Sequence, residues 1–200
     1  MSQQGNVEIV HVHGGNMDTY IDDVVPLFHL YTIFYKQSYD IAQCKEWLTR
    51  RLSTGSNIFL VYHTPADDAV KVTGDNVEGT TEGPSVESDK KTQRSAIGFT
   101  QLHPMYSSVN LEENWLLSDL YIREEYRALK LGQKLISHAL TWGEQTGAFS
   151  MKIETTLHNP RAQYLYPKMG FVEYTRYGDM IEFSHKFPRA LTKEYKSYYD

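Results

Sequence analysis

The clearest pattern of apolar and polar positions lies in the middle of the chain. Residues 115–122 are almost continuously apolar or aromatic, with one carboxylate, Asp119, among them. A β-favouring run without strict alternation predicts a strand that is buried on both faces. After a charged turn at residues 123–127, apolar residues recur from Leu131 onwards at helical spacing, which predicts a helix. Gly147 suits the left-handed position beyond the end of that helix.

A second strand and helix follow directly. Residues 151–156 have the pattern of a short strand. Asn159 followed by Pro160 predicts a helix start, because asparagine caps free amides and the proline ring suits the first helical position. Gly170 closes this segment. The order in this half is therefore strand, helix, strand, helix, strand.

The N-terminal half adds elements of both kinds. Residues 7–12 alternate well enough to predict an edge or early strand. A helix is expected over residues 17–35, where Pro26 either kinks it or divides it into two short helices. Residues 59–62 and 96–102 predict two further strands, which we expect to pair as a hairpin.

A second N-terminal helix is expected over residues 41–52, where Asp40 and Gln43 have the spacing of a capping box. Its predicted buried stripe consists of the apolar residues at helical spacing, Ile41, Cys44, Leu48 and Leu52. The single cysteine is thus interpreted as a small core residue rather than a nucleophile.

Residues 64–94 have a different composition. They contain no aromatic residue and many charged residues, glycines, threonines and serines. Such a segment buries too little apolar surface to offset its ordering entropy, so it predicts a long flexible loop inserted at the hairpin tip. An inert insertion is preferred to a regulatory or partner-binding role.

The composition of the chain makes several classes of function and partner less suitable. A chain of 200 residues, 40% hydrophobic, is long enough for one globular domain with a core. A net charge of −5 argues against nucleic acid and anionic membranes as partners. With one cysteine there is no internal disulfide, and no signal segment or membrane span is recognisable. We therefore expect a cytoplasmic protein, with the nucleus as an alternative.

His11 and His13 lie two residues apart and would share one face of a strand. Two imidazoles on one face can begin a metal site. No third or fourth ligand follows at a suitable spacing, however, so no metal is expected.

The turn between residues 122 and 131 carries a candidate anion site. A strand that passes through a short turn into a helix leaves the first amides of that helix unpaired. Those amides and the helix dipole favour phosphate, and Gly132 allows a ligand to approach the backbone. Arg127, Lys130 and Lys134 place cations around the same turn.

Two motifs in this half together resemble those of the GNAT superfamily of acetyl-CoA-dependent N-acetyltransferases. The family's usual first motif is Q/R-x-x-G-x-G/A. Here it reads R-A-L-K-L-G from Arg127 to Gly132, so that Lys130 replaces the first glycine. The second motif, N-P-R-A-Q-Y-L-Y-P-K-M-G-F from Asn159 to Phe171, matches closely.

The resemblance extends over most of residues 7–187. Residues 31–40, 56–60 and 98–104 look like a microbial branch of the superfamily, and the strand at 115–122 is similar to the yeast histone and polyamine acetyltransferase group. It implies an α/β (α+β) fold whose mixed central sheet is splayed at the acetyl-CoA site and flanked by helices. We accordingly expect a single catalytic domain, followed by a C-terminal tail at 188–200.

The resemblance also implies an enzyme that transfers acetyl from acetyl-CoA to an amine. A small-molecule acceptor, either a polyamine or an amino-acid-like amine, is preferred. A protein or histone lysine acetyltransferase and a non-catalytic acyl-CoA-binding module remain alternatives. Because members of the family commonly form dimers, a homodimer is expected.

The family's cofactor-binding positions can be transferred residue by residue. They comprise the strand that pairs with the pantetheine arm, the pyrophosphate turn, and two residues of the second motif: Leu120, Tyr121, Ile122, Arg127, Ala128, Leu129, Lys130, Leu131, Gly132, Gln133, Asn159 and Tyr166. Asn159 would contact the pantetheine, and its capping role is compatible with that contact.

Catalytic residues are also implied. Tyr166 matches the family's general acid, which protonates the departing sulfur, although a core tyrosine is the alternative. Pro167 follows it directly and predicts an early end to the helix. Asp119 is the best candidate for the base, with a structural ion pair as its alternative. Glu154 and Glu113 are weaker candidates, and deprotonation through water would need no single base.

An aromatic run lies where the family's first helices form the wall of the acceptor pocket. It consists of Tyr31, Phe34, Tyr35 and Tyr39. At helical spacing, such residues are also typical of a core.

Overall fold

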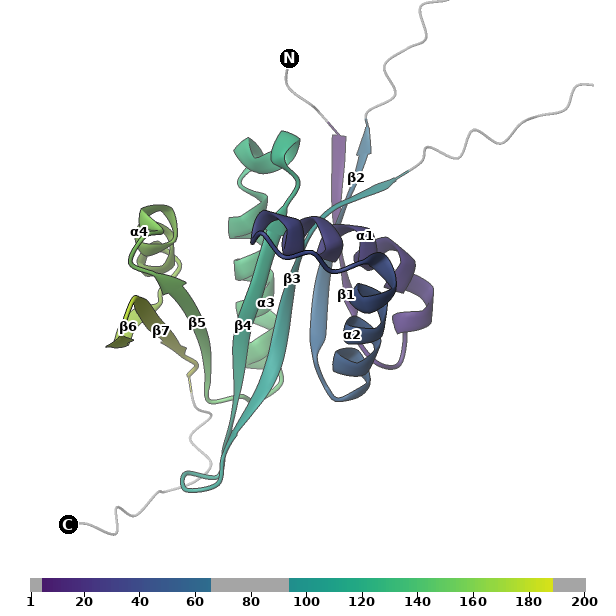
Figure 1. Ribbon diagram of the computed structural model, residues 1–200. Coiled ribbons are helices and arrows are strands. Elements are labelled where there is room, and N and C mark those ends of the chain that lie inside the picture. Colours follow the sequence, from purple (N-terminus) through teal and green to yellow (C-terminus); the bar gives the residue numbers. More distant parts are fainter. Residues whose placement is uncertain (1–4, 66–93, 189–200) are drawn as a thin grey trace, which may run out of the picture.

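The computed structural model of this protein describes residues 5–65 and 94–188. These residues form a seven-stranded sheet with helices on both faces (Figure 1). The insertion expected at 64–94 and the tail expected after Phe187 fall almost entirely outside the described residues. None of the described helices is long and apolar enough to cross a membrane.

The strands are β1 (Gly5–Val12), β2 (Asn57–Pro65), β3 (Ser95–Ser107), β4 (Glu112–Ile122), β5 (Ser150–Thr156), β6 (Val172–Tyr177) and β7 (Met180–Lys186). The helices are α1 (Met17–Phe34), α2 (Ile41–Ser53), the short 3-10 helix η1 (Glu124–Leu129), α3 (Leu131–Gln145) and α4 (Pro160–Lys168). All the predicted strands and helices that lie in the described residues are present.

The strands are ordered β1-β2-β3-β4-β5-β7-β6. Neighbours are antiparallel except β4 and β5, which are parallel and joined by the crossover helix α3. The expected hairpin of β2 and β3 is confirmed, with Phe59 opposite Thr100 in register. The mixed sheet of the sequence-based prediction is thus confirmed.

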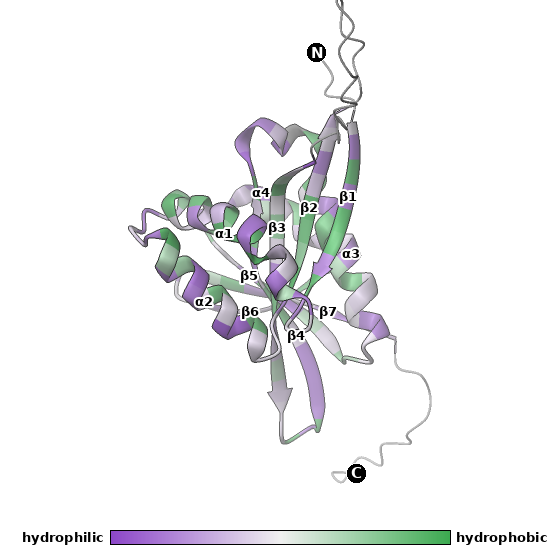
Figure 2. Cartoon of the chain, turned by 90° about the vertical axis from the view of Figure 1, so that its right-hand side faces the viewer, coloured by the Kyte–Doolittle hydropathy of each residue, from purple (hydrophilic) through white to green (hydrophobic). Residues whose placement is uncertain are grey.

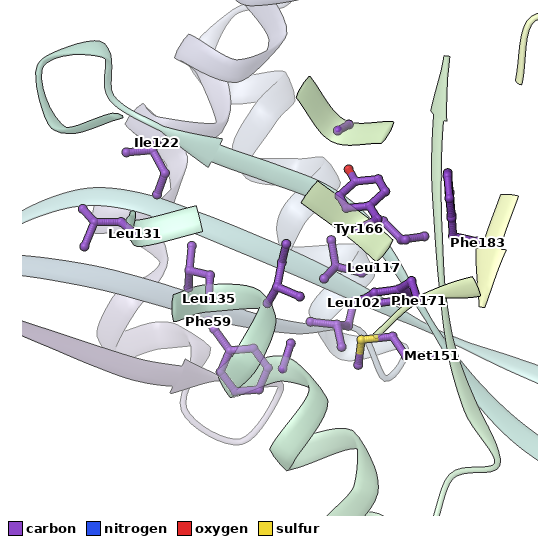
Figure 3. Packing of buried hydrophobic residues seen from close by; sticks show 14 of the residues in the cluster. Phe59, Leu102, Leu117, Ile122, Leu131, Leu135, Met151, Tyr166, Phe171 and Phe183 are labelled. Carbon is purple, nitrogen blue, oxygen red and sulfur yellow. The ribbon is translucent and has the colours of Figure 1, made fainter. Parts of the chain in front are cut away.

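Apolar side chains form a core on each face of the sheet. On one face, α3 and α4 cover β-strand residues in a cluster that includes Leu117, Leu135 and Tyr166 (Figure 3). On the other face, α1 and α2 cover a second cluster that includes Phe28 and Leu48. Figure 2 shows these two helices on one side of the strands and α3 on the other.

Local signals in the sequence correctly predicted several helix ends. Asp40 and Gln43 form both hydrogen bonds of a capping box at the start of α2. Asn159 caps α4 by accepting a hydrogen bond from the Ala162 amide at 3.1 Å. Gly147, beyond α3, has a φ of +76°, a conformation that glycine adopts without a steric penalty.

The predicted burial was wrong in two places. Of residues 115–122, only Leu117 and Ile122 are buried, because much of the strand lines an open cleft rather than a core. The strand buried on both faces is β2, in which residues 57–63 are all buried. Ile41 is 47% exposed at the first position of α2, although Cys44 and the rest of the predicted stripe are buried.

Pro26 neither ends nor divides the first helix, since α1 runs from Met17 to Phe34 with the proline inside it. Pro167 lies one residue before the end of α4 at Lys168, so the helix ends soon after the proline, as expected. Tyr166 therefore remains helical and keeps its place against the core.

Candidate active site

The sheet opens between β4 and β5. Their register ends at Leu117 opposite Ile153. Directly afterwards Ser118 is an extra residue in β4, because neighbouring residues of β3 pair with Leu117 and then with Asp119. A bulge of this kind bends a strand and increases its twist. β4 therefore diverges from β5 beyond Leu117, as Figure 1 shows.

The divergence leaves backbone groups of β4 without a strand partner. The Asp119 carbonyl and the Arg123 amide both bond to β3. Backbone groups alternate between the two edges of a strand, so Leu120 and Ile122 direct theirs towards the opening. The Ile122 carbonyl there accepts a hydrogen bond from Arg127 Nε at 3.1 Å.

The turn after β4 places a helix start at the same opening. Lys130 precedes α3 with a left-handed φ of 56°, and no side chain caps the helix. The first amides of α3 are therefore available to a ligand. A Cβ added at Gly132 would meet only a Leu120 methyl carbon, at 3.7 Å, so the backbone is open to close approach.

A cleft of about 950 Å³ occupies the opening. Its lining includes nine of the residues expected to bind cofactor: Leu120, Tyr121, Ile122, Arg127, Lys130, Gly132, Gln133, Asn159 and Tyr166. Leu129 ends η1 and Leu131 begins α3, and neither is among the described residues that line the cleft. Ala128 lies in η1. Residues from two distant segments of the chain thus meet at one surface.

Tyr166 lies at the edge of both the core and the cleft. Its ring packs on Phe171 and Phe183, at centroid distances of 6.1 and 5.7 Å, and the residue is 8% exposed. Burial, and secondarily the nearby Tyr35 hydroxyl, raise the pKa of Tyr166 to about 12. The phenol is therefore protonated at neutral pH and able to donate its proton.

Aromatic side chains of α1 and the residue after it form one wall of the cleft. Tyr31, Phe34 and Tyr35 all line it, and the last two are more than half exposed. The rings of Tyr31 and Tyr35 pack edge to face, with their centroids 4.9 Å apart. We call the part of the cleft lined by Tyr31, Tyr35 and Tyr166 the tyrosine end. Tyr39, by contrast, does not line the cleft.

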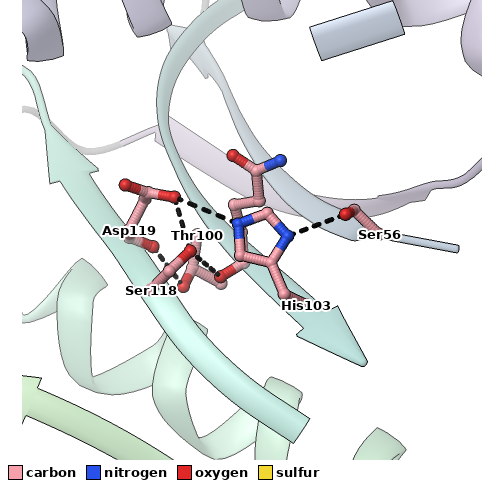
Figure 4. A network of polar contacts seen from close by, with 6 residues as sticks. Ser56, Thr100, His103, Ser118 and Asp119 are labelled. Atoms are coloured by element: carbon pink, nitrogen blue, oxygen red, sulfur yellow. Dashed lines mark hydrogen bonds and ion pairs between the residues drawn. The ribbon is translucent and has the colours of Figure 1, made fainter. Parts of the chain in front are cut away.

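The candidate bases occupy different places. Asp119 does not line the cleft; its carboxylate accepts a hydrogen bond from Ser118 Oγ at 2.5 Å (Figure 4) and, after burial, contributes to the raised pKa of Tyr31. Glu154 lines the cleft and accepts a hydrogen bond from Tyr177 at 2.5 Å. Glu113 is exposed near the start of β4, at the closed end of the strand pair.

Sequence reasoning missed some residues that line the cleft. Ser118, Arg161 and Tyr164 are among them. Arg161 and Tyr164 could have been found from the second motif, since both lie on the first turns of α4 beside Asn159. Ser118 carries no signal in the sequence, because only strand pairing reveals the bulge.

The profile of the acetyltransferase (GNAT) family matches residues 42–171, more than half of the chain. The protein belongs to the GNAT family. The uncharacterized N-acetyltransferase YhfO of Bacillus subtilis is 29% identical over 152 residues, which cover 76% of this chain and 83% of that protein. The D-amino-acid N-acetyltransferase HPA3 of Saccharomyces cerevisiae is 33% identical over 76 residues, which cover 38% of this chain and 47% of that protein.

A solved structure agrees with these relatives. The crystal structure of a probable acetyltransferase shares 27% sequence identity with this GNAT protein and superposes with a TM-score of 0.61. The match covers 86% of this chain and 95% of the other. The predicted GNAT fold is confirmed, and the chain is an acetyl-CoA-dependent N-acetyltransferase.

The cleft of this GNAT enzyme fits acetyl-CoA, its acyl donor. Backbone groups of Leu120 and the Ile122 amide face the opening, where they can pair with an extended amide-containing arm in the manner of an added strand, while Arg127 holds the Ile122 carbonyl. Uncapped amides at the start of α3, with Arg127 and Lys130 beside them, suit a pyrophosphate. The pantetheine arm and the pyrophosphate of the donor thus each have a matching part of the cleft.

Proposed function

We propose that this GNAT enzyme transfers acetyl directly from acetyl-CoA to the primary amine of a small molecule, within a ternary complex. The observation that carries the proposal is the opening of β4 from β5 at the Ser118 bulge. It brings free strand groups, a cationic helix start and the tyrosine end into one cleft. Such a cleft can hold a donor and an acceptor side by side.

The donor is held by the cofactor-binding residues of the sequence-based prediction. Within residues 120–122, the amides of Leu120 and Ile122 would pair with the pantetheine arm and polarise the thioester oxygen. The turn at residues 128–133, including the amides of Ala128, Leu129 and Leu131, would hold the pyrophosphate. Asn159 would contact the pantetheine from the start of α4. When bound, acetyl-CoA supplies the acetyl group as an activated thioester.

Tyr166 is the proposed general acid. Its hydroxyl donates a proton to the sulfur that leaves with CoA. The raised pKa of about 12 keeps that proton in place until the sulfur develops negative charge. The packing of the ring against Phe171 and Phe183 fixes the position from which the hydroxyl acts.

Asp119 is the proposed base. The carboxylate does not line the cleft itself, but it follows Ser118, which does, and after burial its charge contributes to the raised pKa of the cleft-lining Tyr31. Glu154 is less suitable, since its carboxylate already accepts the Tyr177 hydroxyl. Glu113 lies at the closed end of the β4–β5 pair.

Within the small amines, an amino-acid-like acceptor is favoured over a polyamine. Among the described residues that line the cleft, Glu154 is the one acid, whereas Arg127, Lys130 and Arg161 are cations. Because these cations outnumber the acid, the lining would attract a positively charged polyamine only weakly. The yeast relative, a D-amino-acid N-acetyltransferase by name, supports the same preference.

The proposal includes a homodimer that acts in the cytoplasm. β6 is an edge strand with every residue exposed, among them Val172, Tyr174 and Tyr177. An exposed edge with apolar side chains is suited to pairing with a second copy. Sedimentation equilibrium of the full chain tests this: a single monomeric species at high protein concentration would remove the dimer from the proposal.

The function is tested by measuring free CoA release with acetyl-CoA and a panel of acceptors. The panel contains glycine, D- and L-phenylalanine, spermidine and a lysine-containing peptide. We expect release above background with amino acids and less with spermidine. Fastest release with the peptide would identify a protein acetyltransferase. Tight acetyl-CoA binding with background release throughout would identify a non-catalytic binding module.

The acid role is tested in the same assay. Tyr166→Phe keeps the ring but removes the hydroxyl, so kcat should fall by about 10²-fold or more. The dissociation constant for acetyl-CoA, measured by calorimetry, should change little. Tyr106→Phe, which removes an exposed hydroxyl away from the residues that line the cleft, is the matched control. Equal kcat values for the Tyr166 variant and the wild type would remove Tyr166 from the mechanism.

A further inference from the structure

Four aromatic side chains form a continuous surface at the tyrosine end of the cleft. They are Phe34, Tyr35, Tyr31 and Tyr121, and all four line the cleft. In that order each ring contacts the next edge to face, with centroid distances of 5.3, 4.9 and 6.3 Å. Rings from the end of α1, from the residue after it and from β4 are thus joined into one surface, which we call the aromatic wall.

The inner part of the aromatic wall is anchored in the core. Tyr31 packs on Phe28 and Phe99, with both centroid distances at 5.9 Å. Tyr121 packs on Phe99 at 6.3 Å. Phe28 and Phe99 are buried, and a close-packed interior leaves such rings little freedom to move. A binding surface that is fixed before its ligand arrives loses less conformational entropy on binding.

The outer part of the aromatic wall is open to solvent. Phe34 and Tyr35 are both more than half exposed, although each contacts a neighbouring ring. Single exposed apolar side chains are common on protein surfaces, but a contiguous apolar patch marks a binding site. Ligand pockets in particular are lined by aromatic side chains. A row of rings inside a cleft is therefore suited to being covered by a ligand.

The contacts within the aromatic wall indicate the chemistry of that ligand. The edge of an aromatic ring is partly positive and its face partly negative, so rings attract one another edge to face or in offset stacks. A further ring can extend the row by the same contacts. An aliphatic group of similar size gains only from the burial of its surface.

A cation can also lie over the face of an aromatic ring. In the aromatic wall, Phe34 already has such a partner, because the Arg127 guanidinium lies 5.5 Å from its ring centroid. Phe34 therefore connects the wall to the turn that suits the pyrophosphate. The neighbouring ring of Tyr35 lies further along the row and is the exposed one to examine.

We propose that the acceptor amine carries an aromatic ring, which the aromatic wall holds, so that the preferred acceptors are arylalkyl amines, including aromatic amino acids. The inference rests on the proposed function, whose acceptor it specifies. Tyr166, the proposed acid, lines the same end of the cleft. A ring on the wall therefore brings its amine towards the departing sulfur. The reaction is otherwise unchanged: an N–C bond forms, the thioester C–S bond breaks, CoA leaves as the thiol and one proton is released to solvent.

Steady-state kinetics with matched acceptors test the proposal. Phenylalanine is compared with leucine, and 2-phenylethylamine with isopentylamine. The members of each pair share their ammonium group and differ in the presence of the ring. We expect kcat/KM to be about 10-fold or more higher for the aromatic member. A ratio near one in any pair that is acetylated would overturn the proposal.

Substitution of Tyr35 tests the wall itself, and avoids the contact that Phe34 makes with Arg127. Tyr35→Leu removes an exposed ring, so it should lower the aromatic-to-aliphatic ratio of kcat/KM by roughly threefold or more. Tyr35→Phe keeps the ring and should keep the ratio. The matched control is Tyr39→Leu, because Tyr39 is also exposed just beyond α1 but does not line the cleft.

The KM for acetyl-CoA should stay within about twofold in these three variants, because the substitutions act on the acceptor. A ratio that is undiminished in Tyr35→Leu would overturn the assignment of the ring to the aromatic wall. A ratio that falls equally in Tyr39→Leu would overturn it as well.

Binding can also be measured without turnover. CoA carries no acetyl group, so the enzyme saturated with CoA binds an amine but cannot acetylate it. In calorimetry of this complex, phenylalanine should bind with a Kd about 10-fold lower than that of leucine. Equal dissociation constants would overturn the proposal.

The outcomes separate this inference from the proposed function. A wild type that acetylates aromatic and aliphatic amines equally well would refute the aromatic acceptor and leave the function standing. A wild type that acetylates none of the amines, but binds phenylalanine more tightly than leucine in its CoA complex, would refute the function. The aromatic wall would then remain a site that binds a ring.

Discussion

At the scale of single residues, the backbone at Lys130 explains a departure from the family motif. Lys130 occupies the first glycine position of the motif and has a φ of 56°. This left-handed conformation costs a non-glycine residue about 1 kcal/mol. The lysine cation lines the cleft beside the start of α3, where it favours phosphate. A lysine at this position thus adds a positive charge to the cleft but leaves the backbone in a less favourable conformation.

Replacing Lys130 separates these two effects. Lys130→Gly should raise the free energy of unfolding by about 0.5–1 kcal/mol and weaken acetyl-CoA binding, since the strain and the cation are both lost. Lys130→Ala loses the cation but keeps the strain, so it should weaken binding without the gain in stability. Urea denaturation and calorimetry at two salt concentrations provide the measurements. Tighter acetyl-CoA binding by Lys130→Gly would contradict a phosphate role for the cation.

At the scale of secondary-structure elements, α4 depends on one residue for both its start and its function. Asn159 caps the helix through the Ala162 amide and also lines the cleft. The cap fixes the first turn of the helix, and the helix in turn positions Tyr166 two turns later. A side chain in the cap position is therefore brought to the donor site by the geometry of the helix itself.

Two substitutions distinguish the cap from the ligand contact. Asn159→Ala should lower the free energy of unfolding by about 1 kcal/mol and weaken acetyl-CoA binding. Asn159→Ser retains a capping oxygen, so stability should return to near the wild-type value while binding stays weak. Denaturation curves and calorimetry report the two effects separately. Full recovery of binding in the serine variant would leave Asn159 with the capping role alone.

At the scale of the whole molecule, partly desolvated imidazoles make stability depend on pH. Burial lowers the pKa of His11, His103 and His138 below the ordinary value of 6.5. Below pH 6.5 the unfolded chain therefore binds more protons than the folded one, so the free energy of unfolding falls as pH falls. Above that pH, these histidines are neutral in both states, so they no longer make the free energy of unfolding change with pH.

Urea denaturation between about pH 7 and about pH 5 measures this slope. His11→Gln removes one titrating group and keeps a donor for the hydrogen bond to Asn57 that His11 makes at 2.8 Å. The variant should show a shallower loss of stability in the same range. A stability that rises towards pH 5 would contradict the lowered pKa values.

The sequence by itself determined the elements and their ends, because local interactions suffice to form them. The capping box of α2, the Asn159 cap and the helix of residues 131–145 each depend on neighbours within a few positions. It also indicated the turn at Arg127–Gly132 as the donor site, from a motif whose glycine, amides and cations are contiguous.

Tertiary structure decided which side chains meet and which face each one occupies. The single extra residue at Ser118 reverses the alternation of β4 and ends its pairing with β5, and no periodicity in the sequence reveals that event. As a result Ser118 lines the cleft, whereas Asp119 does not and accepts a hydrogen bond from the Ser118 hydroxyl. The burial of β2 and the exposure of Ile41 were likewise set by the packing of distant elements, which local pattern does not contain.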